Sequence, residues 1–333
     1  MRINRGSLLK IAQDTVSRQA RNDPGIVSAY LCGALLEESY LLGGTADIDL
    51  VFIHLSDIPA KREIVRLTDE VHLDIAHHLQ KDYEQTRLVR AHPWLGPSIY
   101  NCQPLYDVGH FLDFVQASVR GQFDRPDTIL GRARSQAEHA RQIWFSLQAL
   151  SNQTSAKEVE LYLRAVSHAA NAVAALSGPP LTERRFLLNF RGRAEAIGRS
   201  GLYAGLLGLL GALNVERETL QSWLPVWRQA IEALPQPVAL PRLHPDRKMY
   251  YLKAFEAMLG QEEYGVVLWP LLNTWTQAIS LLSPEAPQQE SWSVVLKKLG
   301  LGGKEFGDRV SALDAYLDLV EETLEDWAKG TGA

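Results

Sequence analysis

The chain has 333 residues, of which 46% are hydrophobic and 22% are charged, and its formal net charge is −5. This length exceeds the usual size of one domain, so we expect two domains. The acidic balance disfavours nucleic acid as a partner. No apolar secretory segment and no run long enough to span a bilayer is evident, so we expect a cytoplasmic protein without a membrane partner.

The first 107 residues alternate between helix and strand patterns. We expect helices over 7–21, 34–41, 59–69 and 81–91, and strands over 26–33, 47–54, 71–78 and 98–105. This alternation predicts a small mixed sheet with helices packed on it.

From Val108 onward strand-like runs disappear and segments with helical spacing follow one another. The expected helices cover 111–121, 126–150, 156–176, 182–190, 197–213, 215–233, 246–260, 264–282, 290–300 and 305–328. We therefore predict an α+β protein, with a mixed-sheet domain over 1–107 and a larger all-helical domain over 108–333.

Two acids stand inside an apolar strand pattern. Asp47 and Asp49 are two residues apart, so they share one face of the strand, while Ile48 and Leu50 point to the other. Neighbouring carboxylates repel each other, and buried carboxylates need a partner. Oxygen ligands of this kind suit magnesium, so the pair predicts a metal site.

A third acid, Asp74, lies in the middle of the next expected strand. If this strand pairs with the one that carries Asp47 and Asp49, three carboxylates converge, which is enough for a two-metal phosphoryl-transfer site. The alternative for Asp74 is an ion pair with a nearby arginine or lysine.

These residues carry a family resemblance. Residues 25–110 resemble the DNA polymerase β-type nucleotidyltransferase superfamily, whose members have a Gly-Ser after a first strand, an Asp-x-Asp on the next strand and a third acid on a later one. The matching positions here are Gly33-Ala34, Asp47-Ile48-Asp49 and Asp74. Small-molecule members, such as those that modify aminoglycosides, also carry a helical domain after the sheet domain.

The resemblance implies an enzyme that moves a nucleoside monophosphate, with AMP expected, from a nucleoside triphosphate to a hydroxyl of a small-molecule acceptor. It implies two Mg²⁺ ions held by Asp47, Asp49 and Asp74, with Asp74 also helping to deprotonate the acceptor. Gly33 and Ala34 would bind the nucleotide phosphates. Ala34 departs from the family, which has a serine there whose hydroxyl helps to hold those phosphates.

A triphosphate needs cations in addition to the metal ions. We expect them from Arg184 and Arg185, beside a Gly-Pro-Pro turn, and from Lys248 in the basic run 242–248. The alternative for each is a solvated helix end.

Other interpretations remain open. Ala34 is compatible with a weak or inactive nucleotide-binding module, and the same chemistry could act on a protein or RNA end, as in antitoxin-like relatives. Arg134 and His139 match the Arg-x4-His pattern of HEPN-type helical ribonucleases. The sequence does not fix the oligomeric state, a homodimer included.

Overall fold

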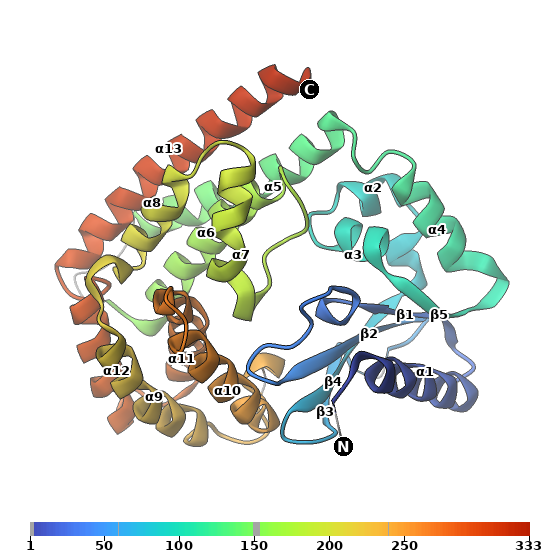
Figure 1. Ribbon diagram of the computed structural model, residues 1–333, viewed down its shortest axis with the longest axis horizontal. Coiled ribbons are helices and arrows are strands. Elements are labelled where there is room, and N and C mark those ends of the chain that lie inside the picture. Colours follow the sequence, from blue (N-terminus) through green and yellow to red (C-terminus); the bar gives the residue numbers. More distant parts are fainter. Residues whose placement is uncertain (1–2, 59, 149–153, 239) are drawn as a thin grey trace. The chain divides into compact units, whose positions relative to one another are not determined.

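The computed structural model describes residues 3–58, 60–148, 154–238 and 240–333 (Figure 1). The chain divides into two compact units, one formed by residues 1–128 and 240–254 and the other by residues 129–239 and 255–333. All five strands belong to the first unit, and the described part of the second unit contains helices and no strand. The protein is therefore α+β, as predicted.

The sheet of the first unit is mixed, with the strand order β3-β4-β2-β1-β5. Strands β2 and β4 are parallel neighbours, and the other pairs are antiparallel. The strands are β1 (Ile26–Cys32), β2 (Ala46–His54), β3 (Arg62–Arg66), β4 (Val71–Leu79) and β5 (Gln103–Asp107).

Helices cover both faces of this sheet (Figure 1). Helix α1 (Arg5–Asn22) packs on one face, where Leu31, Leu50 and Ile75 are buried. The other face carries Tyr30 and Val51 in a core with α2 (Thr86–Ala91), α3 (Leu95–Asn101) and α4 (Phe111–Arg120). Because strand side chains alternate, Asp47 and Asp49 belong to this second face.

The elements expected over 59–69 and 98–105 differ from those in the structure. Residues 62–66 form the edge strand β3, where a helix was predicted over 59–69, of which residue 59 lies outside the described residues. The β-branched pair Ile64-Val65 suits a strand, and its charged flanks suit an exposed sheet edge. Residues 98–101 belong to α3, so the strand predicted over 98–105 begins only at Gln103.

The first unit does not end at Asp107. Helix α4 follows β5 and buries Leu112, Val115 and Val119 against the sheet, because its apolar stripe faces that core. Residues 240–254 also join this unit. They comprise the short 3₁₀ turns η6 (Pro241–Leu243) and η7 (Pro245–Arg247) and the first half of α10 (Lys248–Leu259).

The second unit buries large side chains, including Tyr162, Phe186 and Trp275, in a helical core. Its regular helices are α5 (Pro126–Leu147), α6 (Ala156–Ala174), α7 (Phe186–Ala196), α8 (Gly201–Leu209), α9 (Arg217–Glu232), α11 (Leu268–Leu281), α12 (Pro287–Leu299) and α13 (Glu305–Thr331). The last two residues of the helix expected over 126–150 lie outside the described residues. Within the described part of the chain, no helix combines the length and the apolar character needed to cross a membrane.

Substitution of two adjacent glycines tests how residues 240–254 pack within the sheet unit. Gly43 and Gly44 both have positive φ, but a Cβ on Gly43 would lie 2.1 Å from the Lys253 carbonyl oxygen, whereas one on Gly44 would meet nothing within 4 Å. We predict that Gly44→Ala costs about 1 kcal/mol, the backbone strain alone, and that Gly43→Ala costs about 2 kcal/mol or more. Urea unfolding followed by hydrogen exchange of the β2 amides measures both costs. Equal costs would contradict this packing.

Candidate metal centre

Three aspartate side chains converge on the second face of the sheet. The parallel register of β2 and β4 places Asp49 directly opposite Asp74, and Asp47 lies one side-chain repeat before Asp49. One carboxylate oxygen of each residue lies within 4.8 Å of the others. Asp47 and Asp74 are buried, and Asp49 is partly exposed. The spacing predicted that Asp47 and Asp49 share a face, and the convergence with Asp74 was expected on the condition that the two strands pair, which β2 and β4 do.

Gly33 makes room for one of these carboxylates. Its φ is 76°, and a Cβ at this position would lie 2.1 Å from Asp49 Oδ2. The glycine at the end of β1 is therefore required by the close approach of the Asp49 side chain. This role is additional to the phosphate binding that the resemblance implies.

The segment after Gly33 is shorter than predicted. Ala34 opens η1 (Ala34–Leu36), a single 3₁₀ turn, where a helix was expected over 34–41. The Leu36 amide donates to the Gly33 carbonyl over 3.2 Å, so the turn uses this amide itself. The phosphate-binding role expected of Gly33 and Ala34 therefore has no α-helix N-terminus to support it.

A buried arginine bridges two of the three acids. Arg247 donates from Nη2 to Asp47 Oδ2 and from Nη1 to Asp74 Oδ2, the latter over 3.1 Å. Its side chain is only 8% exposed, and its guanidinium lies over the ring of Tyr250, 4.9 Å from the centroid. The sequence singled out the run 242–248 as a source of cations, but it selected Lys248, the next residue and the first of α10.

A second arginine holds Asp74 from the edge strand. Arg62 Nε lies 2.5 Å from Asp74 Oδ1, and its Nη2 lies 2.7 Å from Oδ2, so the contact is bidentate. The ion pair considered as the alternative for Asp74 is therefore present together with the carboxylate cluster. No sequence pattern indicated Arg62 as a partner of Asp74, because a helix was predicted where β3 lies.

The charges of the three carboxylates are not balanced equally. Arg62 and Arg247 both contact Asp74, and Arg247 contacts Asp47, whereas the part of the chain that the structure describes offers Asp49 no hydrogen bond. Burial raises the pKa of Asp49 to about 8, and the charges of Asp47 and Asp74 add to this rise. Asp49 is thus protonated at neutral pH unless a further cation binds.

The donor set fits a hard divalent cation. Three carboxylates with oxygens close together are the ligands that Mg²⁺ and Mn²⁺ prefer. Asp47 Oδ1 is buried without a hydrogen bond from any described residue, so one lone-pair position is unsatisfied. Asp49 also has no hydrogen-bonded cation among the described residues. Asp47, Asp49 and Asp74 are therefore the residues that would hold a metal ion.

Histidines surround the triad without joining it. His72 pairs with Asp47 across the two strands in the sheet register, and its Nε2 contacts the Asp246 carbonyl oxygen over 2.8 Å. Its Nδ1 lies 3.9 Å from Asp47 Oδ1. Burial lowers the pKa of His72, so it is neutral at pH 7 and adds no charge to the site.

The remaining predicted cation residues lie in the second unit. Arg184 and Arg185 belong to the 3₁₀ turn η4 (Glu183–Arg185), and Arg184 is buried. Their phosphate-binding role remains a prediction.

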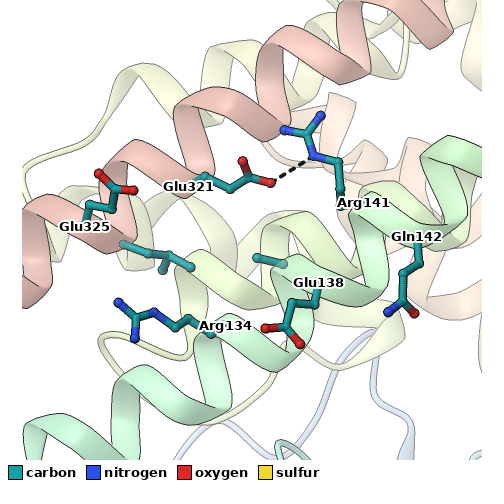
Figure 2. A pocket seen from close by; sticks show the side chains of 8 residues that line it. Arg134, Glu138, Arg141, Gln142, Glu321 and Glu325 are labelled. Carbon is teal, nitrogen blue, oxygen red and sulfur yellow. Dashed lines mark hydrogen bonds and ion pairs between the residues drawn. The ribbon is translucent and has the colours of Figure 1, made fainter.

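A surface pocket of about 360 Å³ lies between α5 and α13 in the second unit (Figure 2). Arg141 reaches across it to Glu321 over 2.9 Å and also pairs with Asp314 and Asp318. Figure 2 shows the Glu321 carboxylate turned toward Arg141. These contacts join the two helices, and acidic side chains outnumber arginines along the pocket.

The residues of the ribonuclease-like pattern lie on α5. Arg134 lines this pocket beside Glu138, Glu321 and Glu325, an acidic surrounding that does not suit an RNA backbone (Figure 2). His139 stacks on His168, with ring centroids 5.5 Å apart.

No protein-family model matches this sequence, and it has no match among curated proteins.

The unfolding free energy of the metal-free protein should contain a pH-dependent contribution from Asp49. An unfolded aspartate ionises at about pH 4, whereas folded Asp49 keeps its proton to about pH 8. Between these values the folded state binds more protons, so this contribution makes the protein less stable as pH rises. Asp49→Asn removes it, and the stability of the natural chain relative to this variant should fall by at most about 1.4 kcal/mol per pH unit.

Urea unfolding of both proteins in a chelating buffer measures this difference. Comparing the two cancels the titration of the histidines, several of which have lowered pKa values and so favour the folded state as pH rises. A difference that is constant between about pH 5 and about pH 7.5 would contradict the raised pKa of Asp49.

Proposed function

We propose that the protein is a divalent-metal-dependent nucleotidyltransferase that moves a nucleoside monophosphate, with AMP as the expected group, from a nucleoside triphosphate to a hydroxyl of a small acceptor. The observation that supports this most directly is the convergence of Asp47, Asp49 and Asp74 on two parallel neighbouring strands. The resemblance of residues 25–110 to polymerase β-type nucleotidyltransferases supplies the reaction type.

The three aspartates would hold the metal ions, which would supply Lewis-acid stabilisation of the charge that develops on the phosphate oxygens. In the reaction the acceptor oxygen forms a bond to the α-phosphorus, the bond from this phosphorus to pyrophosphate breaks, and the acceptor proton passes to a carboxylate. The protein itself must orient these carboxylates, neutralise the phosphates and accept the proton.

The geometry favours Asp49 as the proton acceptor. Arg62 engages both oxygens of Asp74, so neither oxygen is left without a donor. Asp49 has no guanidinium hydrogen-bond partner among the described residues, and burial raises the pKa of its carboxyl, so it is the better placed of the two to take up a proton. This differs from the role that the resemblance implies for Asp74, which instead is a carboxylate held in position by Arg62.

The arginine pairs favour a second candidate, a nucleotide-binding module of the same fold without catalysis. Arg62 and Arg247 already balance two of the three negative charges, so the cluster can exist without a metal ion. Ala34, which lacks the hydroxyl of the family serine, is also consistent with weakened catalysis. The two candidates differ in whether pyrophosphate is released.

We predict that Asp49→Asn abolishes Mg²⁺-dependent binding of a nonhydrolysable ATP analogue and lowers transfer by at least about 100-fold, because a neutral amide neither holds the metal nor accepts the proton. Calorimetry measures binding, and pyrophosphate release with a panel of polyhydroxylated acceptors measures transfer. Asp57→Asn is the matched control, since Asp57 is an exposed acid on the same unit.

Three outcomes decide the proposal. Binding and pyrophosphate release that are lost in Asp49→Asn but kept in Asp57→Asn support the transferase. Metal-dependent binding without release for any acceptor and any of the four nucleotides supports the binding module and rejects the transferase. No binding of the nucleotide by the natural chain, with or without Mg²⁺, rejects both candidates.

A further inference from the structure

Arg247 competes with a metal ion for the same carboxylates. Its guanidinium contacts Asp47 Oδ2 and Asp74 Oδ2, the side chains that a divalent cation would need. A cation and a guanidinium repel each other, and the low dielectric of a buried site strengthens this repulsion. A bare ion therefore binds only where Arg247 moves away or where negative charge is added.

The ion pair of Arg247 is buried but incomplete. Arg247 Nε and Asp47 Oδ1 are both buried without a hydrogen bond from any described residue. A buried polar group without a hydrogen bond destabilises the folded state relative to a paired one. A ligand with more oxygen atoms than the two carboxylates could therefore accept hydrogen bonds that Arg247 does not make in its ion pair.

The backbone on both sides of Arg247 is anchored to the sheet unit. The carbonyl of Asp246 contacts His72, and Lys253 pairs with Glu70 over 2.6 Å. The Lys253 carbonyl lies against Gly43. With the chain fixed at these points, the guanidinium can change partners by rotation of its own side chain.

A polyphosphate is the anion that could accept the Arg247 guanidinium after it leaves the carboxylates. Arginine binds phosphate oxygens through a planar fork of donors, as it binds carboxylates. Moving a buried guanidinium into an apolar surrounding would be costly, but moving it from carboxylate to phosphate keeps it paired. The arriving phosphates also offset the positive charge of the metal ions.

We propose that Arg247 is a specificity-determining residue that makes the triad selective for a divalent ion bound to a polyphosphate over the bare ion. Without nucleotide it fills the place of the ion between Asp47 and Asp74, and with a nucleoside triphosphate it pairs with the phosphates. This inference rests on the proposed function, because it needs the triad to bind metal.

The experiment measures affinity for Mn²⁺ by calorimetry in the full chain, without nucleotide and with a nonhydrolysable ATP analogue. We expect Arg247→Gln to bind bare Mn²⁺ at least about tenfold more tightly, because its competitor is removed. We expect the same variant to bind the Mn²⁺–nucleotide complex at least about tenfold more weakly, because a phosphate partner is lost. A purely structural role of Arg247 would not change the two affinities in opposite directions.

Arg62→Gln is the matched control, since it also removes one guanidinium from Asp74. Arg62 is 48% exposed and does not contact Asp47, so we expect a smaller gain for bare Mn²⁺ and no loss for the nucleotide complex. Arg247→Lys keeps the charge and guards against misfolding of the glutamine variant. We expect the affinity of Arg247→Lys for bare Mn²⁺ to stay as weak as that of the natural chain. We expect its affinity for the Mn²⁺–nucleotide complex to fall, because a single ammonium binds phosphate oxygens less well than the planar guanidinium does.

The outcomes separate this inference from the proposed function. Unchanged Mn²⁺ affinity in Arg247→Gln, or changes of the same sign in both measurements, overturns the role of Arg247 while the metal site stands. No Mn²⁺ binding by the natural chain or by any variant, with or without nucleotide, overturns the metal site and the inference with it.

Discussion

The repulsion among three neighbouring carboxylates, two of them buried, is the constraint on which the site depends. Two parallel strands place Asp49 opposite Asp74 with Asp47 beside them, and this arrangement exists only if positive charge accompanies it. The chain supplies part of that charge through Arg62 and Arg247. It leaves Asp49 without a counter-ion among the described residues, so the site combines internal neutralisation with one remaining place for a cation.

The sheet and its site depend on residues far away in the sequence. Arg247 lies 200 positions after Asp47, yet residues 240–254 pack within the sheet unit. The contacts of Lys253 with Glu70 and Gly43 hold this segment there. A protein cut at Asp107, where the strand pattern ends, would lose the cation that neutralises the buried carboxylates, and removing one partner of a buried pair typically costs about 3–5 kcal/mol.

The sequence predicted the parts of the fold that follow from periodicity. The two-residue alternation in β2 and β4 predicted both strands and the shared face of the acids, and the helical spacing predicted the helices of the second unit. Periodicity failed for β3, where five residues with charged ends form an exposed edge strand. It also could not identify Arg62 and Arg247 as partners of Asp74, because side-chain pairing between distant segments leaves no periodic pattern.

Arginine and metal are alternative solutions to the same electrostatic problem, and they lead to different chemistry. A guanidinium neutralises a carboxylate but offers no empty orbital to a phosphate oxygen, whereas a divalent ion does both. Had the chain provided a third arginine for Asp49, the cluster would be a closed structural network. The lack of this third partner among the described residues, together with the incomplete pairing of Arg247 and Asp47, leaves the cluster open to a ligand. This incomplete neutralisation of the acidic cluster by its own arginines is the physical basis of the metal site proposed above.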